Sequence, residues 1–218
     1  MKDLKKRKLV IAMKHIRNSL LVLFVSGQIC LMASPVFAGF VLFSDNFNSE
    51  NSGVGALNYT GFTNWSVTGG TVDLIGNGYY DFYPAQGLYV DLDGSTNQAG
   101  TILTKQVFSL SPGEYTLEFK LGGNARGAPI DDITVTVLVG LFNKEYHLAS
   151  DAGLLQFVES FTILTQTTGQ LQFSNSGGDN QGAILDDVTL TMVSEPASML
   201  LLGFGLLGLV GFATRRKK

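Results

Sequence analysis

Cysteine is almost absent from this sequence, whose 218 residues include a single one, Cys30, in an apolar stretch near the N-terminus. A disulfide needs two thiols, and a thiolate metal site needs several. Residues 39–218 contain no cysteine. Disulfides, thiolate metal centres and cysteine nucleophiles are therefore excluded from this part of the chain.

Basic side chains are also scarce, except near the two ends. Residues 1–38 and 215–218 together hold 11 of the 15 lysine and arginine residues. Residues 39–193 hold 4 basic and 16 acidic side chains, which gives a net charge of −12. A surface of this charge repels phosphate backbones, so we expect no nucleic-acid partner, and it favours divalent cations.

Histidine is nearly absent as well, because His147 is the only one beyond residue 38. A lone histidine in a strand or turn is usually structural, and a Ser-His-acid triad has no other candidate base here. A glycosidase needs two carboxylates about 5–10 Å apart in a cleft, and nothing in the sequence singles out such a pair. We therefore predict that the protein is not an enzyme.

The first 38 residues follow the order of a secretory signal peptide. Basic residues come first, then the apolar run Leu20–Met32, then a segment rich in small residues that ends at Ala38. An uncleaved membrane anchor is the alternative, but the run has 13 residues, and a helix needs about 20 to cross the hydrocarbon core. We predict export by the secretion machinery and cleavage between Ala38 and Gly39.

A second apolar run, Met199–Ala213, is followed by a basic tail. Together with its neighbours this run is at the short limit for a transmembrane helix, and the basic tail predicts a cytoplasmic end. An ordinary membrane anchor is one interpretation of this segment. The tail consists of Arg215, Arg216, Lys217 and Lys218.

The residues before this run carry a more specific pattern, consisting of Ser194, Glu195, Pro196, Ala197 and Ser198. With the Gly- and Leu-rich run and the basic tail, it resembles the PEP-CTERM sorting signal of Gram-negative bacteria that produce exopolysaccharide. The family's leading proline is Ser194 here. The resemblance implies an exported protein that is held transiently in the inner membrane. An exosortase, a membrane cysteine protease, would then cut it and pass it to the cell surface or extracellular matrix.

Residues 39–193, between the signal peptide (1–38) and the sorting signal (194–218), are enough for one domain with a single core. Polar and apolar residues alternate in segments such as Leu88–Leu92, Tyr115–Leu121 and Val188–Met192. Glycine-rich turns separate these segments, and long helical periodicity is missing. The pattern predicts about ten short strands and an all-β sandwich.

An internal repeat supports this prediction. Residues 122–137 align without gaps onto residues 177–192, with identical residues at 8 of 16 positions. Each copy consists of a glycine-rich loop, an Asp-Asp pair and a strand, and each follows another strand. We interpret the copies as two similarly placed strand pairs of one sandwich, with their loops on the same rim.

Alternation in the second copy distinguishes its two aspartates. Asp186 shares a face with Val188 and Leu190, whereas Asp187 shares the opposite, solvent face with Thr189. Asp186 is therefore predicted to point into the core, where an ionised carboxylate needs N–H donors, a basic partner or a metal ion. Capping of backbone amides and ligation of Ca²⁺ are the two interpretations.

Several short segments resemble the galactose-binding-like jelly rolls that include many carbohydrate-binding modules. Such modules often hold a structural Ca²⁺ between the acidic segment of the first strand and an aspartate of the last. By this resemblance Asp45, Glu50 and Asp186 are the candidate calcium ligands. The segments are Phe43–Glu50, Asn64–Val67, Gly87–Gly94, Tyr115–Phe119 and Ala183–Val188.

Saccharide binding requires aromatic faces for the apolar side of a sugar and polar groups for its hydroxyls. Three tyrosines lie in the turn-rich segment Gly76–Pro84, and polar side chains lie in the two repeated loops. The tyrosines could also simply cover the end of the sandwich, and Trp65 is predicted to be in the core. The candidate ligand-binding residues are Tyr79, Tyr80, Tyr83, Asn124, Arg126 and Asn180.

Two functions follow from these patterns. The first is a non-catalytic, exosortase-processed surface or matrix protein whose jelly roll binds extracellular polysaccharide. The second is a structural or adhesive matrix protein of the same fold without a discrete ligand site. A glycoside hydrolase is a distant third.

Overall fold

The computed structural model describes residues 39–96, 98–127, 131–137, 142–177, 179–194 and 205. For residues 131–137 and 142 it describes the backbone alone. Ala38–Ser194 forms one compact unit. The predicted signal peptide, Glu195–Ser198 and the basic tail lie outside the described residues.

Six antiparallel strands form the first sheet, and β13 lies at its centre. β7 pairs with one side of β13, while β4 and β1 pair with successive parts of its other side. The strands, in spatial order, are β10 (Leu155–Ile163), β7 (Gly113–Gly122), β13 (Ile184–Val193), β4 (Leu88–Asp91) and β3 (Asp73–Gly76), with β1 (Phe40–Asp45) beside β13.

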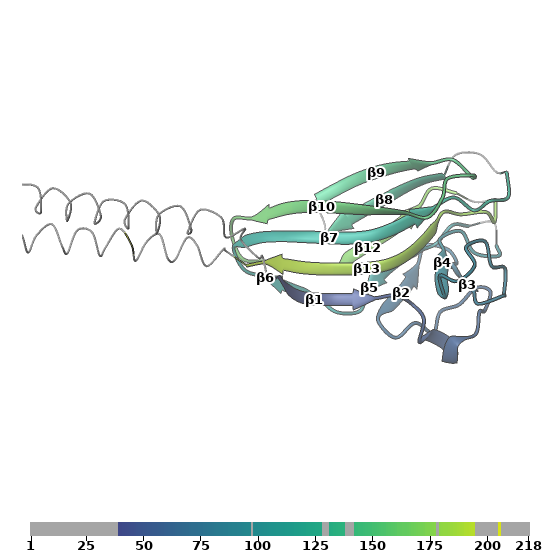
Figure 1. Ribbon diagram of the computed structural model, residues 1–218, viewed down its shortest axis with the longest axis horizontal. Helices are drawn as coiled ribbons and strands as arrows, with labels where there is room; N and C mark the ends of the chain where they lie inside the picture. Colours follow the sequence, from purple (N-terminus) through teal and green to yellow (C-terminus); the bar gives the residue numbers. More distant parts are fainter. Residues whose placement is uncertain are drawn as a thin grey trace, which may run out of the picture. The chain divides into compact units, whose positions relative to one another are not determined.

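Five antiparallel strands form the second sheet, which packs against the first (Figure 1). Its strands, in spatial order, are β2 (Trp65–Thr68), β5 (Thr101–Thr104), β12 (Leu171–Asn175), β8 (Asp131–Val137) and β9 (Phe142–Leu148). A two-stranded ribbon of β6 (Phe108–Leu110) and β11 (Thr167–Gly169) and a 3₁₀ turn, η1 (Glu50–Gly53), complete the described elements. The fold is an all-β jelly-roll sandwich, as predicted.

The apolar residues of alternating strand positions meet between the two sheets. Trp65 is fully buried, and its ring makes edge contacts with Phe43 at 5.3 Å and Phe173 at 5.9 Å between centroids. Such aromatic pairs contribute about 0.5–1.5 kcal/mol beyond the area they bury. The prediction that Trp65 belongs to the core is confirmed.

The strand of each repeat copy pairs with the strand that precedes the other copy. β7 pairs with β13 and β8 pairs with β12, so each repeated loop crosses from one sheet to the other at the same rim. Asn124 Nδ2 of the first loop donates a hydrogen bond to the Gln181 carbonyl oxygen of the second, at 2.6 Å. Ala125 and Asn180, which occupy equivalent positions, both have positive φ angles, of 56° and 65°. The shared rim predicted from the repeat is confirmed.

Asp186 is buried, as predicted, but on the other face of its strand. The pairing of β13 with β7 shifts register between Asp186 and Thr189, and Asp187 has a φ of 49°. This bulge reverses the alternation, so Asp186 lies opposite Lys120, on the outer face of the sheet, while Leu185 and Val188 both face the core. The Asp187 N–H donates to Asp186 Oδ1 at 2.8 Å, which favours the amide-capping interpretation.

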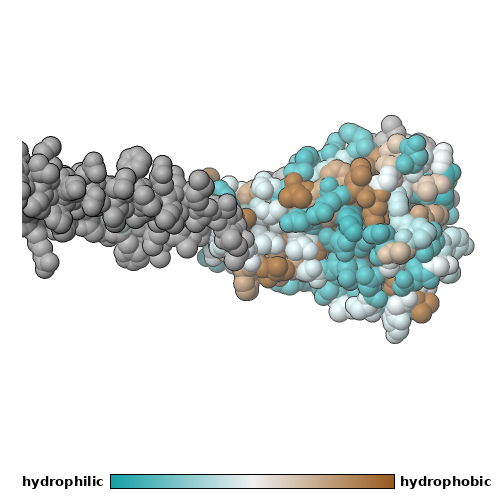
Figure 2. All heavy atoms as spheres, viewed as in Figure 1, coloured by the Kyte–Doolittle hydropathy of each residue, from teal (hydrophilic) through white to brown (hydrophobic). Residues whose placement is uncertain are grey.

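On the face of the sandwich drawn in Figure 2, hydrophobic residues form small separate patches among hydrophilic ones. In the described part of the chain, no helix reaches the length and hydropathy that a membrane crossing requires. The predicted C-terminal helix lies outside the described residues, apart from Gly205.

Candidate functional site

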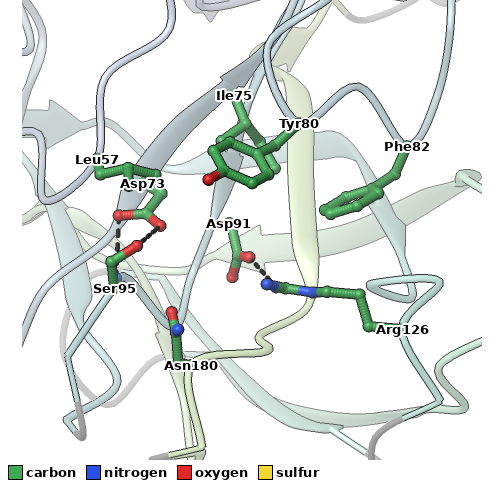
Figure 3. Close-up of a pocket in the computed structure, with 9 residues that line it drawn as sticks. All are labelled: Leu57, Asp73, Ile75, Tyr80, Phe82, Asp91, Ser95, Arg126 and Asn180. Atoms are coloured by element: carbon green, nitrogen blue, oxygen red, sulfur yellow. Dashed lines mark hydrogen bonds and ion pairs between the residues drawn. The ribbon is translucent and has the colours of Figure 1, made fainter.

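A small pocket of about 90 Å³ opens at the rim where the repeated loops meet, on the outer face of the six-stranded sheet (Figure 3). Strands β3 and β4 form its floor, and loops from five parts of the chain form its walls. Its lining residues are Leu57, Asp73, Ile75, Tyr80, Phe82, Asp91, Ser95, Arg126 and Asn180.

Two buried aspartates, Asp73 and Asp91, lie directly opposite each other on β3 and β4. Like charges in this arrangement repel, so each carboxylate needs its own donors. Asp73 Oδ1 accepts hydrogen bonds from the backbone N–H groups of Asn58 at 2.6 Å and Ser95 at 3.1 Å. Asp73 Oδ2 accepts one from Ser95 Oγ at 2.7 Å. Asp73 thus fixes two loops at the edge of the pocket.

Asp91 fixes the second repeated loop and the Arg126 side chain. Its Oδ1 accepts hydrogen bonds from the backbone N–H groups of Asp93 and Gly182, both at 3.0 Å. Its Oδ2 lies 2.5 Å from Arg126 Nη2. Gly182 allows this close approach, because a Cβ there would lie 2.2 Å from the Asp93 nitrogen.

Burial raises the pKa of Asp91 to about 7. This value includes a smaller raising effect of the nearby Asp73 carboxylate and the lowering effects of the Asp93 and Gly182 N–H groups and the Arg126 guanidinium. The Asp91 side chain is only 1% exposed, so its ionised form has little access to water. Arg126 is therefore the counter-ion of a carboxylate that is buried in the pocket floor.

The first repeated loop presents Arg126 to the pocket through Asn124. Asn124 is fully buried, and its Oδ1 accepts the Arg126 N–H at 2.9 Å. The Arg126 guanidinium lies 5.1 Å from the centre of the Phe82 ring, which places it over an aromatic face. This contact and the Asp91 ion pair hold the guanidinium from two sides (Figure 3).

The turn between β3 and β4 supplies the aromatic side chains of the pocket. The Tyr83 hydroxyl lies 2.6 Å from the Gly123 carbonyl oxygen and 2.7 Å from that of Ala152, and these two acceptors share its one hydrogen. The Tyr83 N–H in turn donates to the Tyr89 hydroxyl at 3.0 Å. Tyr83 therefore anchors the turn, and Tyr80, which is 56% exposed, lines the pocket.

The structure brings together three of the six candidate ligand-binding residues, since Tyr80, Arg126 and Asn180 line the pocket. Tyr79 lies beside them but not in the lining, and its ring packs edge-on against Tyr80 at 4.9 Å. Tyr83 and Asn124 do not line the pocket. They hold its turn and its loops in place through hydrogen bonds.

Sequence reasoning missed Asp73, Asp91 and Phe82 as pocket residues. Alternation places Asp73 on the same strand face as Ile75, and Asp91 on the same face as Tyr89. Asp73 and Asp91 therefore share strand faces with large apolar side chains, and each is close to a turn. This was the one sign in the sequence of a polar site at the rim. Which strands pair could not be read from the sequence.

The three calcium candidates do not form one cluster, and no three acidic or histidine side chains of the described residues lie close enough together to hold a metal ion. Asp45 accepts hydrogen bonds from Phe47 N, Asn64 Nδ2 and Trp65 Nε1. Both Glu50 carboxylate oxygens accept the Thr63 N–H, at 2.8 and 3.0 Å. Calcium binding at these acids stays a prediction.

A second, more open hollow of about 630 Å³ lies beside the turn between β2 and β3. It has no aromatic or charged side chain in its lining, so it offers less to a ligand than the rim pocket. It is lined by Val67, Thr68, Gly69, Gly70, Thr71, Thr96 and Gln98.

Residues 193–217 match the PEP-CTERM protein-sorting motif. The resemblance stated from the sequence is thus confirmed, and the chain carries the sorting signal of an exported protein. The match begins at Val193, the last residue of β13. No curated protein matches the sequence significantly.

Three solved structures illustrate the likeness of the fold. A family 22 carbohydrate-binding module with a GH10 module, from a Clostridium thermocellum xylanase complexed with xylohexaose, is 15% identical, with a TM-score of 0.42 over 72% of this chain and 29% of that one. A family 6 module of a Zobellia galactanivorans laminarinase is 12% identical, with a TM-score of 0.41 over 68% of this chain and 98% of that one.

The third structure is the K1 adhesin domain of a Porphyromonas gingivalis lysine-specific gingipain. It is 14% identical, with a TM-score of 0.47 over 70% of this chain and 98% of that one. This chain spans less than a third of the xylanase structure. At such low similarity these matches carry no information about what this chain binds.

Proposed function

We propose that this protein is an exported, non-catalytic surface or matrix protein that binds polysaccharide through the rim pocket. The observation that carries the proposal is the exposed Tyr80 ring beside fixed charged groups, Arg126, Asp73 and Asp91. An aromatic face packs against the apolar face of a sugar, while nearby charged groups bind its hydroxyls. The sorting motif supports an extracellular setting for such a ligand.

The place of the pocket in the fold suits this role. β13 begins at the rim, where Ile184 pairs with Asp91, and it ends at Val193, where the sorting motif starts. The pocket and the start of the sorting motif thus lie at opposite ends of the same strand. Attachment through the motif would leave the pocket accessible to a polymer outside the cell.

Binding is a better use of this pocket than hydrolysis. A glycosidase needs one carboxylate as an acid and a second as a base or nucleophile. Asp73 and Asp91 each accept three hydrogen bonds or ion-pair contacts from the protein itself. Both carboxylates use most of their acceptor positions to hold the loops and Arg126 in place, which supports a non-catalytic role.

Replacing Tyr80 with alanine should weaken polysaccharide binding about 5- to 30-fold, because a stacked aromatic face contributes about 1–2 kcal/mol. The measurement is affinity electrophoresis in gels that contain the exopolysaccharide of the source bacterium, with a glycan array to identify the sugar. Tyr79→Ala is the matched control, since Tyr79 is adjacent but does not line the pocket. Equal losses in both variants would contradict the proposed site, and no binding by the wild type would favour the structural or adhesive alternative.

The sorting motif predicts proteolytic processing near its Glu195-Pro196 pair. The mature protein recovered from the cell surface or medium should lack the residues that follow about position 196, including the basic tail. Intact-mass spectrometry measures this directly, and a Pro196→Ala variant should accumulate as the longer form. A mature wild-type product that keeps Arg215–Lys218 would show that the motif is not processed.

A further inference from the structure

The rim pocket has a net negative charge although an arginine lines it. Its lining includes the carboxylates of Asp73 and Asp91 and a single cationic group, the Arg126 guanidinium. Asp179, next in sequence to the lining residue Asn180, is exposed and adds another negative charge to the same loop. Residues 39–193 as a whole carry 16 acids and 4 bases, so no wider positive field compensates.

Arg126 is not available as a receptor for an anion. Its guanidinium is paired with Asp91 at 2.5 Å, and Asp91 is 1% exposed. A ligand carboxylate that recruited Arg126 would have to compete with a buried counter-ion, and it would leave the Asp91 charge unpaired. The donors that Arg126 has left can still bind neutral hydroxyl oxygens, because a guanidinium carries five N–H donors.

The two aspartates have room for hydroxyl donors. An ionised carboxylate has about four acceptor positions. Asp73 uses three of them for Asn58 and Ser95, and Asp91 uses three for Asp93, Gly182 and Arg126. Each retains about one position, which a sugar hydroxyl can fill by donating its hydrogen. A ligand carboxylate or sulfate has no hydrogen to donate.

Because the pocket is small, its net negative charge acts on a bound ligand at short range. A volume of about 90 Å³ corresponds to about three waters at about 30 Å³ each, so a sugar places only part of its ring, with one or two of its substituents, in the pocket. An acidic group on a ring bound here would lie in the same small space as both aspartates. The repulsion between like charges would act at short range, where salt screens it least.

We propose that the rim pocket selects uncharged sugars and rejects uronic acid and sulfated sugars of the same ring shape. This inference rests on the proposed function, because it specifies the chemical class of the saccharide that the pocket binds. The selectivity comes from the Asp73–Asp91 pair, and Arg126 provides donors to hydroxyls without providing a net positive site.

The test compares polymers that differ in charge alone. The full-length protein in detergent is run by affinity electrophoresis against barley β-glucan, galactomannan and xyloglucan, and against the same polymers after oxidation of their primary alcohols to carboxylates. Polygalacturonate and alginate complete the acidic set. At pH 8 and 50 mM NaCl we expect at least one neutral polymer to bind at least tenfold more tightly than its oxidised form, and most of this ratio to persist at 300 mM, where only the longer-range repulsion from the acidic domain is screened.

Two substitutions with equal changes in net charge locate the effect. Asp179→Asn, in the loop that contributes Asn180 to the pocket, should reduce the ratio about two- to threefold. Glu145→Gln, an exposed acid on β9 of the other sheet, should leave the ratio unchanged. Equal reductions would assign the selectivity to overall charge and overturn the role of the pocket.

The possible failures are distinguishable. Equal or tighter binding of the oxidised or naturally acidic polymers would overturn the charge selectivity while leaving polysaccharide binding intact. An absence of binding to every polymer, neutral and acidic, would overturn the proposed function and this inference with it.

Discussion

Replacing Asp45 with alanine should lower the free energy of unfolding by about 3–5 kcal/mol, because an unsatisfied buried donor costs about 1–3 kcal/mol. Asp45 is 8% exposed at the end of the first strand. Its Oδ1 accepts the Phe47 N–H at 2.9 Å, and its Oδ2 accepts Trp65 Nε1 at 2.9 Å and Asn64 Nδ2 at 3.0 Å. Alanine would leave the buried Trp65 and Phe47 donors without these acceptors.

Chemical denaturation with urea measures this loss, and Asn46→Ala is the matched control. Asn46 is the next residue, is exposed, and accepts one hydrogen bond from the Asn48 N–H at 3.2 Å. We expect this control to cost less than about 1 kcal/mol, as surface substitutions usually do. A similar small effect for Asp45→Ala would show that the Asp45 hydrogen bonds do not stabilise the sandwich.

The same variant tests the calcium prediction. If Asp45 acts through its N–H donors, Asp45→Ala loses the same free energy in Ca²⁺ and in chelator. If Asp45 is a calcium ligand, the loss appears only in Ca²⁺, because a metal that binds the native state stabilises by mass action. Sodium chloride at equal ionic strength controls for general screening of the acidic surface.

The sandwich was predictable because its strands alternate strongly and glycine-rich turns separate them. The segments Leu88–Leu92 and Tyr115–Leu121 became β4 and β7 with small changes in their ends, whereas Val188–Met192 became the second half of the longer strand β13. The segment Thr101–Leu110 split into β5 and β6, and the described residues form thirteen strands where about ten were expected. Strand pairing depends on contacts between distant residues, which periodicity does not contain.

The face of Asp186 was not predictable from alternation. The prediction assumed an uninterrupted strand from Asp186 to Met192, whereas the structure has a bulge at Asp187, with its φ of 49°. A bulge inserts one residue and reverses the parity of everything before it. Aspartate tolerates positive φ better than most residues, but that tendency alone does not mark a bulge.

The candidate site was predictable in its loops but not in its floor. The repeat correctly placed its two glycine-rich loops on one rim, and they contribute Arg126 and Asn180 to the pocket. Tyr80 and Tyr83 are close in sequence and chemically alike, yet Tyr80 is exposed and Tyr83 ties the turn to Gly123 and Ala152. The different roles of Tyr80 and Tyr83 depend on which backbone carbonyl groups lie near each hydroxyl, and only the fold determines that.

Lowering the pH from 7.5 to 5.5 should stabilise the protein by about 2–4 kcal/mol, because two buried carboxyls then bind protons that the unfolded chain does not. Burial raises the pKa of Asp91 to about 7. Burial and the neighbouring Asp187 charge also raise the pKa of Asp186 to about 7, while the Asp187 N–H and Lys120 lower it. The ordinary value for both is 3.8.

The direction of this effect follows from proton binding. Between pH 3.8 and about 7, the folded protein keeps these two protons and the unfolded chain has released them. Stability therefore falls as the pH rises through this window, by up to about 1.4 kcal/mol per pH unit for each group. Above the folded pKa both states are ionised and the dependence ends. Urea unfolding at pH 5.5, 6.5 and 7.5 measures the slope.

Single substitutions assign the slope to its two sources. Asp91→Asn and Asp186→Asn should each remove about half of the change in stability between pH 5.5 and 7.5, because an amide does not titrate. Glu145→Gln changes the net charge equally at an exposed position on β9 and should leave the slope as it is. A stability that stays constant or rises with pH, or a slope that persists in the Asp91→Asn, Asp186→Asn double variant, would contradict the prediction. The Asp91 half of the effect is the free-energy cost of keeping an ionised carboxylate in the pocket floor at neutral pH, where it holds Arg126 in place.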